Sequence, residues 1–360
     1  MHRVVAAFAL LVSLPNLASA VLISTGNGTG NVTGPATTNP YFNNVVSTWV
    51  RTGSAVYLGN GWMLTDNHVG AGTTMINGVF YDVLPGSEHQ LKNPTGATFT
   101  DDSDVLLYRI NATPNLPTIP IGASVPRSGD NVVMIGNGRD RLPNLIGWTG
   151  AWSPIDPPAA YTGYLWSTTN QVRWGTNVIE AVGFPQGSGN TSNVVFSTNF
   201  SATNATPYEA VGTPGDSGGG VFSYNTTAGR WELIGLMVSY TKFSGQPWGI
   251  SVFGNSTYAI QLSVYRNQIL SYITPGDVTG DGKVDIADLS IVATNWQTTK
   301  IDGDANHDGR VDIGDVGYIA LNWGAPPGIQ AVPEPQTCAL AISALLAAAP
   351  FALRRFTRRR

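Results

Sequence analysis

A serine set among glycines is the first residue in this sequence whose surroundings could support chemistry. The segment TPGDSGGG, Thr213 to Gly220, places Ser217 directly after Asp216 and among four glycines. In a surface turn, such glycines supply conformational freedom and nothing more. Around a serine nucleophile they have a second use, because main-chain N–H groups must approach a developing oxyanion closely. The segment therefore predicts either a flexible loop or the nucleophile of an acyl-transfer site.

A serine hydroxyl is a poor nucleophile at neutral pH, so Ser217 needs a base within hydrogen-bond reach and an acid to orient that base. Of the four histidines, His2 falls in the N-terminal leader and His307 in a C-terminal repeat, which leaves His68 and His89. His68 follows the apolar run of GWMLTDNHV after a short polar turn, which places its imidazole at the rim of a sheet. His89 lies in PGSEHQLKNP and is typical of an ordinary loop histidine.

The elements that must position these groups read as short strands. Between residues 45 and 240, runs rich in Val, Ile, Trp and Tyr alternate with turn residues, as in SAVYLGNGWMLT, DVLLYRI, NVVMIGNG and WELIGLMVSY. Many short strands at this spacing favour an all-β barrel or sandwich. We expect residues 221–224 and 231–238, joined by NTTAGR, to form a hairpin.

The segments on either side of these strands have different patterns. Residues 21–44 begin with a stretch of Gly, Thr and Asn containing few apolar residues, which predicts a mobile leader. After the strands, apolar residues recur three or four positions apart, as on one face of a helix. We therefore expect one helix packed on the barrel, with its apolar face made by Tyr258, Leu262, Tyr265, Ile269 and Ile273.

Three of these segments together resemble the active-site segments of trypsin-like (chymotrypsin-fold) serine proteases. GWMLTDNHV, DSDVLLYRI and GDSGGG occur in the family's order of His, Asp and Ser. The resemblance covers residues 45–274 and implies a mainly β fold of two six-stranded antiparallel barrels with a C-terminal helix. It implies a serine endopeptidase that hydrolyses polypeptides, in which His68 is the general base, Asp104 orients it and Ser217 attacks the scissile carbonyl.

Two details of the site also follow from the resemblance. Asp104 is preferred to Asp101 and Asp102 because it directly precedes the apolar strand, as the family's aspartate does. The N–H groups of Gly215 and Ser217 would form the oxyanion hole, and no cofactor is needed for this chemistry.

The same resemblance locates the pocket for the substrate side chain that precedes the scissile bond. By that resemblance, Val211, six residues before Ser217, corresponds to the residue that lies at the floor of the pocket. Ser239, Tyr240 and Thr241 belong to VSYT, which resembles the strand that pairs with the substrate backbone. Because Val211 offers no carboxylate to a Lys or Arg side chain, we expect a preference for small or apolar residues.

Two features common in that family are missing. Cys338 is the only cysteine, so no intramolecular disulfide can form. No Ile-Val-Gly-Gly type of start follows Ala20, although in many members such a freed amine pairs with the acid before the serine, here Asp216. Either the site forms without this activation or the partner of Asp216 is internal.

Two acidic segments in residues 275–325 repeat each other without a gap, 27 residues apart. Each offers oxygen ligands at loop positions 1, 3, 5, 7, 9 and 12, with a glycine at the sharp turn, which is the spacing of an EF-hand Ca²⁺ loop. A solvated acidic loop is the alternative. The predicted ligands of two Ca²⁺ ions are Asp277, Thr279, Asp281, Lys283, Asp285 and Asp288, then Asp304, Asn306, Asp308, Arg310, Asp312 and Asp315.

One helix after each loop resembles the dockerin type I module, which implies a cohesin-type partner. Dockerins commonly carry a Ser/Thr pair at loop positions 10 and 11, where this chain has Ile286-Ala287 and Ile313-Gly314. A Ca²⁺-folded spacer between the enzyme and the cell surface is therefore an equal alternative.

Both ends of the chain resemble sorting signals. Residues 1–20 have the early arginine, apolar stretch and small-x-small ending of a signal peptide, with cleavage expected after Ala20. Residues 326–360 join Pro-Glu-Pro, a short apolar run from Thr337 to Leu353 and five arginines. This tail resembles the PEP-CTERM sorting signal of bacterial proteins, which implies export, transient inner-membrane anchoring by a short transmembrane segment, and a final place at the cell surface or outside the cell.

Composition argues against nucleic-acid binding, and one rival to the enzyme remains. Charged residues make up 12% of the chain and the net charge is −4, so there is no broad basic surface for nucleic acid. The rival to the enzyme is a noncatalytic surface-binding or adhesion protein whose protease-like barrel has lost its activity. The complete His, Asp and Ser set favours the enzyme, and the missing activation start favours the rival.

Overall fold

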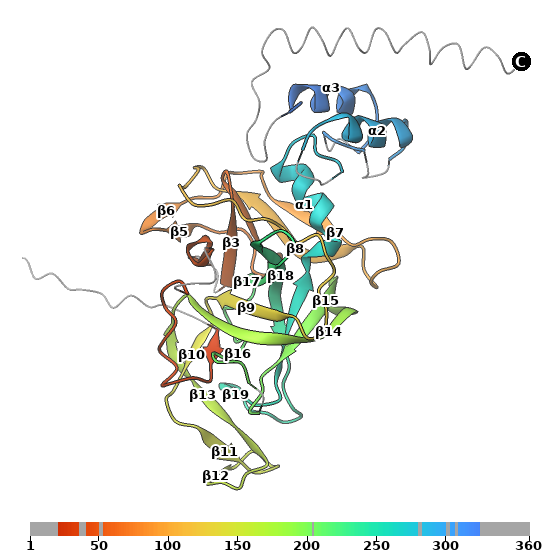
Figure 1. The fold of residues 1–360 in the computed structure, drawn as a ribbon. Coiled ribbons are helices and arrows are strands. Elements are labelled where there is room, and N and C mark those ends of the chain that lie inside the picture. Colours follow the sequence, from red (N-terminus) through yellow and green to blue (C-terminus); the bar gives the residue numbers. More distant parts are fainter. Residues whose placement is uncertain are drawn as a thin grey trace, which may run out of the picture.

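The computed structural model describes residues 21–35, 41–49, 53–203, 205–279, 283–299, 303–306 and 309–324. The body is built of strands, and a small helical module lies at one end beyond helix α1 (Figure 1). The predicted signal peptide and sorting tail lie outside these residues. Within the described ranges, no helix has the length and apolar character needed to cross a membrane.

A closed six-stranded antiparallel barrel forms the second half of the body, as the sequence predicted for one of its two barrels. Its order is β14-β15-β20-β18-β17-β9. The predicted hairpin is confirmed, because β17 pairs with β18 and Tyr224 lies opposite Trp231. The strands are β9 (Asn131–Gly136), β14 (Arg173–Ser188), β15 (Thr191–Asn199), β17 (Gly220–Asn225), β18 (Arg230–Tyr240) and β20 (Ser256–Gln261).

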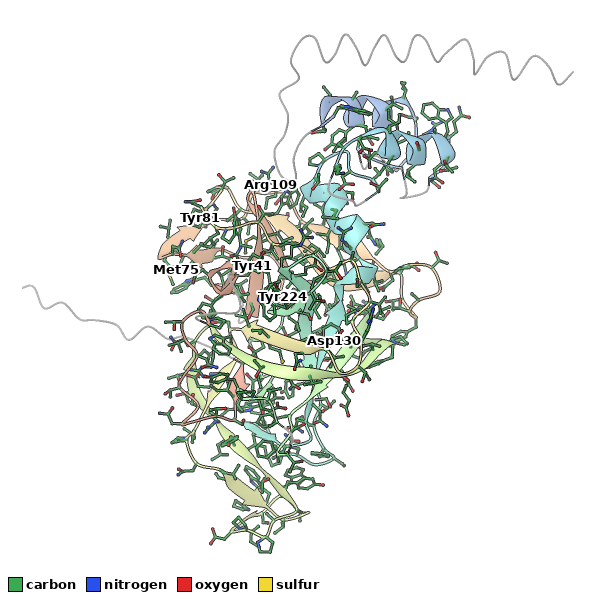
Figure 2. All side chains as sticks on the ribbon, viewed as in Figure 1. Tyr41, Met75, Tyr81, Arg109, Asp130 and Tyr224 are labelled. Carbon is green, nitrogen blue, oxygen red and sulfur yellow. The ribbon has the colours of Figure 1, made fainter. Side chains whose placement is uncertain are left out.

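The first half differs from the expected second six-stranded barrel. Its strands form a seven-stranded sheet in the order β6-β5-β2-β3-β4-β8-β7, with β6 and β7 at the two ends. Figure 2 shows Met75 and Tyr81 on the outlying β5–β6 hairpin. The strands are β2 (Val45–Thr48), β3 (Gly53–Gly59), β4 (Trp62–Asp66), β5 (Thr74–Ile76), β6 (Val79–Tyr81), β7 (His89–Lys92) and β8 (Asp102–Arg109).

The two halves share one large core. Val56, Leu64 and Val105 of the seven-stranded sheet pack in the same buried cluster as Phe222 and Ile260 of the barrel. Alternation of apolar and polar residues along the strands places these side chains on the inner face. The shared core fixes the two halves against each other, and residues at their junction are therefore held in place.

A further sheet, which the sequence did not predict, is inserted largely between β9 and β14. It consists of β10 (Arg139–Arg141), β11 (Ile146–Trp148), β12 (Pro154–Ile155) and β13 (Tyr161–Asn170), joined by β19 (Ile250–Val252). In Figure 1, β11 and β12 lie at the end of the body opposite the helical module.

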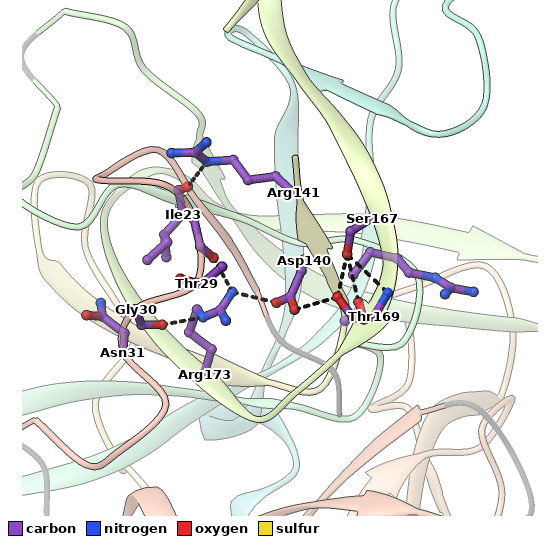
Figure 3. A network of polar contacts seen from close by, with 12 residues as sticks. Ile23, Thr29, Gly30, Asn31, Asp140, Arg141, Ser167, Thr169 and Arg173 are labelled. Atoms are coloured by element: carbon purple, nitrogen blue, oxygen red, sulfur yellow. Dashed lines mark hydrogen bonds and ion pairs between the residues drawn. The ribbon is translucent and has the colours of Figure 1, made fainter. Parts of the chain in front are cut away.

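The start of the N-terminal segment packs against the barrel, so the expectation of a mobile leader from residue 21 is wrong. Strand β1 (Leu22–Ile23) pairs with β16 (Ala210–Val211), and Val21 is fully buried. Two buried arginines bind the backbone that follows: Arg141 donates to the carbonyl of Ile23, and Arg173 to those of Gly28 and Gly30 (Figure 3). These guanidinium groups satisfy carbonyls in a segment too poor in apolar residues to be fixed by hydrophobic packing.

The predicted helix is shorter at its start than expected. Tyr258 lies in β20, a short 3₁₀ turn (η2, Leu262–Val264) follows, and α1 spans Arg266–Ile273. Tyr265, Ile269 and Ile273 are buried in the shared core, as the periodicity predicted. A second 3₁₀ turn, η1, spans Phe42–Asn44 and falls in the stretch that was expected to be mobile.

The helical module contains α2 (Ile286–Thr294) and α3 (Ile313–Leu321), each directly after one of the two repeats. Both helices begin with the same capping box, made by Asp285 with Asp288 and by Asp312 with Asp315. The sequence repeat is thus also a structural repeat. The module has its own core of Val284, Val292, Ala305, Val311 and Ile319.

Candidate active site

The predicted base and its orienting acid are brought together by the pairing of β4 with β8. Asp66 lies opposite Val105, so the residues just beyond β4 lie beside the start of the apolar part of β8. Nδ1 of His68 is 2.7 Å from Oδ2 of Asp104, and the His68 backbone N–H donates to Oδ1 at 2.8 Å. This hydrogen bond raises the pKa of His68, and partial burial lowers it. In the neutral ring, Nδ1–H is the donor and Nε2 is the acceptor.

Asp104 itself is held from both sides. Its backbone N–H donates to Oδ1 of Asn193 at 2.8 Å, and its carbonyl accepts from the backbone of Asn67 at 2.7 Å. The residue is buried. His89 plays no part in this arrangement: it lies in β7 rather than in a loop, and its ring stacks on Tyr272 with the centroids 4.2 Å apart.

The loop between β16 and β17 carries Ser217 and is anchored to the seven-stranded sheet. The backbone N–H of Ser54 donates to the Ser217 carbonyl, and the Ser54 hydroxyl donates to the Gly215 carbonyl, both at 2.8 Å. The next N–H, that of Gly218, donates to Oδ2 of Asp66 at 2.8 Å, and the same oxygen is 4.0 Å from Nδ1 of His68. One carboxyl oxygen therefore lies beside both the imidazole and the residue after the serine.

A tight turn precedes the serine and explains the glycine within it. The N–H of Asp216 donates to the carbonyl of Thr213 at 3.0 Å, with Pro214 second and Gly215 third in the turn. Gly215 has φ of +103°, as the third position of a type II turn requires. A Cβ there would lie 2.7 Å from the carbonyl oxygen of Asn137, so another residue would be both strained and obstructed.

The two N–H groups that were predicted to form an oxyanion hole make no hydrogen bond to any of the described residues. The amides of Gly215 and Ser217 donate to no group there, and the Ser217 hydroxyl makes no hydrogen bond there. Amides that are fixed in a turn and unpaired can bind a developing negative charge without reorganising. The turn thus offers the hydrogen-bond donors that acyl-transfer chemistry requires.

Asp216 is held by internal donors. Its Oδ1 accepts from Gly138 N–H at 2.7 Å, and its Oδ2 accepts from the backbone and hydroxyl of Thr213 at 2.8 and 3.0 Å. Burial raises the pKa of Asp216 to about 7, against the lowering effect of these donors. The sequence left open whether the site forms without activation or whether Asp216 has an internal partner. The structure shows internal partners for this carboxyl.

A cavity of about 340 Å³ opens beside Ser217. Ser239 and Tyr240 line it, but Val211 and Thr241 do not. The assignment of Val211 to the pocket floor is wrong, because β16 pairs with β1 and buries Val211 against Leu22, Tyr164 and Phe200. The lining residues are Gly212, Thr213, Pro214, Asp216, Ser217, Met237, Val238, Ser239, Tyr240, Lys242, Trp248 and Thr257.

The sequence analysis missed three residues of this site. Asp66 is fully buried beside the imidazole, and a charged residue at the end of the apolar run GWMLT was the available signal. Thr213 holds Asp216, but its role depends on the fold of the turn and has no local signature. Lys242 comes directly after the strand that was expected to bind the substrate, and it was therefore not predicted. It lines the cavity because the chain leaves β18 at this point and turns back toward β19.

The two repeats place matching oxygen atoms in matching positions. Oδ1 of Asp288 accepts from the backbone of Thr279 and its Oδ2 from the backbone of Asp285, and Asp315 binds Asn306 and Asp312 in the same way. Asp277, Asp288 and Asp315 are fully buried. No group of three or more His, Cys, Asp or Glu side chains converges within the described ranges, and Asp281 and Asp308 lie outside them.

No protein-family model matches the chain, and neither does any curated protein. Among solved structures, the chain is similar to the inactive form of the Rv3671c protease of M. tuberculosis H37Rv. The identity is 14% and the TM-score 0.38, over 66% of this chain and 94% of that one. It is also similar to the HtrA-type protease AlgW with a tripeptide, at 21% identity and a TM-score of 0.37, over 64% of this chain and 61% of that one. For the structure of AlgW with a decapeptide, the identity is 22% and the TM-score is 0.36, over 62% of this chain and 51% of that one.

Proposed function

We propose that the protein is a serine endopeptidase that cleaves polypeptides with His68, Asp104 and Ser217. The observation that carries the proposal is the conjunction of an oriented imidazole with two unpaired amides at the serine. Asp104 fixes the His68 tautomer through Nδ1, and the Gly215 and Ser217 amides have no partner in the part of the chain that the structure describes. Neither arrangement is needed for the stability of a β-barrel.

The reaction follows from these roles. Ser217 Oγ attacks the scissile carbonyl while Nε2 of His68 takes its proton, and the imidazolium so formed is stabilised by Asp104. The carbonyl oxygen becomes an oxyanion, which accepts hydrogen bonds from the Gly215 and Ser217 amides. His68 returns the proton to the leaving amine, and water then releases the acyl group by the same steps in reverse order. The buried turn keeps Gly215 in a conformation that aims its amide at the oxyanion.

A fluorophosphonate probe tests the proposal, because it forms a covalent adduct with an activated serine only. We expect one adduct per molecule on the purified protein, none on Ser217→Ala, and an unchanged adduct on the matched control Ser223→Ala, whose hydroxyl donates to the Asn131 carbonyl in the barrel. A folded protein that forms no adduct and cleaves no peptide would contradict the proposal and favour a noncatalytic surface-binding protein.

We also propose that the helical module binds two Ca²⁺ ions through the loop residues predicted from the sequence. The buried carboxyls of Asp277, Asp288 and Asp315 support this, since buried carboxylates without a cation are costly. A hard cation prefers such an all-oxygen set and would neutralise it. The module would then serve as a spacer or docking unit for an exported protein, and the terminal segments would act as signal peptide and sorting tail.

A further inference from the structure

The cavity beside Ser217 has a cation on its lining that lacks an acidic partner. Lys242 follows β18 and lines the cavity together with Ser239 and Tyr240. Its ammonium makes no ion pair with any residue of the described ranges. A cation beside a nucleophile selects by charge, because it attracts one sign of substrate side chain and repels the other.

Lys242 is positioned by aromatic residues. Its ammonium lies 5.8 Å from the ring centroid of Trp248, and Trp248 packs edge-on against Trp166 at 5.0 Å. Trp166 belongs to β13 of the inserted sheet and donates from Nε1 to the Ser251 hydroxyl at 2.8 Å. The inserted sheet thus supports one wall of the cavity, and the cation–π contact keeps the lysine stem along that wall.

Two other polar side chains on the lining, those of Thr257 and Ser239, are also available as donors. The Thr257 hydroxyl accepts from Gly212 N–H at 2.8 Å and the Ser239 hydroxyl accepts from Gln186 at 3.0 Å; neither donates to a described residue. The one carboxyl on the lining, Asp216, has both oxygens occupied by Gly138 and Thr213. The cavity therefore has spare donors and a positive charge, but no spare carboxylate.

We infer that this cavity binds an acidic side chain, so that the enzyme cleaves after Glu or Asp and Lys242 determines this specificity. The inference rests on the proposed function and replaces the preference for small or apolar residues expected from Val211. It also assigns a role to the inserted sheet, which holds Trp166 and through it Trp248 and Lys242.

The test uses fluorogenic peptides that differ only at the residue before the scissile bond: Glu, Gln, Ala, Leu or Lys. Glu and Gln have the same shape, so the ratio of their kcat/KM values isolates the charge. We expect Glu to exceed Gln by about two- to fivefold, as an ion pair with the exposed Lys242, worth up to about 1 kcal/mol, gives. The ratio should fall as salt is added, because screening weakens that attraction.

Two variants make the test specific. Lys242→Met keeps an apolar stem beside Trp248 and removes the charge, so it should bring the ratio of the kcat/KM values for Glu and Gln close to one. Arg127→Met is the matched control: it makes the same change in net charge on the exposed loop before β9, away from the cavity, and should leave the ratio as it is.

The outcomes separate this inference from the function on which it rests. Cleavage with a preference for Ala or Leu, or an unchanged Glu to Gln ratio in Lys242→Met, would overturn the specificity and leave the protease intact. Absence of both cleavage and fluorophosphonate labelling would overturn the two proposals together. Labelled enzyme that cleaves only after Lys would show that the cation does not face the substrate, and would also overturn the inference.

Discussion

The carboxyl of Asp66 lies beside the imidazole of His68, with its Oδ2 4.0 Å from Nδ1. It is fully buried, its Oδ2 accepts from Gly218, and its Oδ1 has no hydrogen-bond partner among the described residues. Burial raises the pKa of Asp66 well above its ordinary value, and the neighbouring Asp104 raises it further. Asp66 in turn raises the pKa of His68. At the scale of single residues, the protonation of the base is therefore set by two carboxyls rather than one.

We predict that Asp66→Asn shifts the acid limb of the kcat/KM profile to lower pH. The amide oxygen of asparagine can still accept from Gly218, so the loop stays in place, but the carboxyl that raises the His68 pKa is gone. The limb is measured from kcat/KM at a series of pH values. Asp102→Asn on the exposed start of β8, which pairs with Lys92, is the control and should leave the limb unchanged. An unmoved limb in Asp66→Asn would mean that Asp66 remains protonated over the whole range.

The turn from Thr213 to Asp216 is the element that positions the amides proposed to form an oxyanion hole. Thr213 donates its hydroxyl to Asp216 and accepts at that same hydroxyl from Arg139 N–H at 2.6 Å. The raised pKa of Asp216, about 7, has a defined consequence for stability. Its contribution is fully present below the unfolded value of about 3.8 and is lost as the pH rises through about 7, because burial penalises the ionised form.

Thr213→Val should destabilise the protein by about 1–3 kcal/mol, because it leaves Asp216 and the Arg139 N–H each without one buried partner. The hydroxyl also lowers the Asp216 pKa, so in the variant the loss of stability should extend to higher pH. Denaturant unfolding between pH 4 and pH 9 measures both effects. Thr213→Ser retains the hydroxyl and should behave like the parent; equal losses in Ser and Val variants would contradict this account.

The N-terminal segment is a second element whose position rests on a few polar contacts. Arg173 is 1% exposed and binds Oδ1 of Asp140 at 2.6 Å as well as two carbonyls of the segment (Figure 3). We predict that Arg173→Met costs about 3–5 kcal/mol, since it leaves the Asp140 carboxylate buried and unpaired. Thermal unfolding measures this. Arg139→Met, which removes exposed contacts to Thr168 and Asn170, should cost less than about 1 kcal/mol.

At the scale of helices and strands, prediction from the sequence succeeded for some elements and failed for others. The pattern of short strands was sufficient for one barrel and the hairpin. His68, Asp104 and Ser217 came from the resemblance of three segments to a protease family, and the structure brings His68 and Asp104 together. Val211 and the leader were assigned wrongly for one shared reason: the pairing of β1 with β16 joins segments far apart in the sequence, and no local pattern encodes it. The inserted sheet was missed because four of its strands have only two or three residues and because the longer β13 mixes polar with aromatic residues, so that its periodicity is weak.

At the scale of the whole molecule, the β-rich body and the helical module have separate cores and should respond separately to Ca²⁺. The module core is Val284, Val292, Ala305, Val311 and Ile319, and it shares no residue with the large core of the body. A metal that binds only the folded module stabilises that unit alone by mass action. Loss of Ca²⁺ should therefore leave Ser217 reactive.

We predict that adding EDTA lowers the unfolding transition of the module and leaves that of the body unchanged. With Ca²⁺ at one hundred times its Kd, the module should gain about 2.7 kcal/mol for each ion that it binds. Hydrogen exchange at the backbone amides of α2 and α3 reports on the module, and fluorophosphonate labelling reports on the body. Asp288→Asn with Asp315→Asn should abolish the effect of Ca²⁺; a single transition that shifts with Ca²⁺ in both reporters would show that the two units unfold together.

The pairing of β1 with β16 also dictates an order of assembly. Residues 21–23 are made first, but their partner strand is made only shortly before the serine, so the contact must close across most of the domain. Contacts of such long sequence separation form late in folding. The turn that starts at Thr213 continues directly from β16 and is set only when that strand is in place. A nascent chain in which β16 has not yet paired with β1 should therefore lack the ordered turn that precedes Ser217.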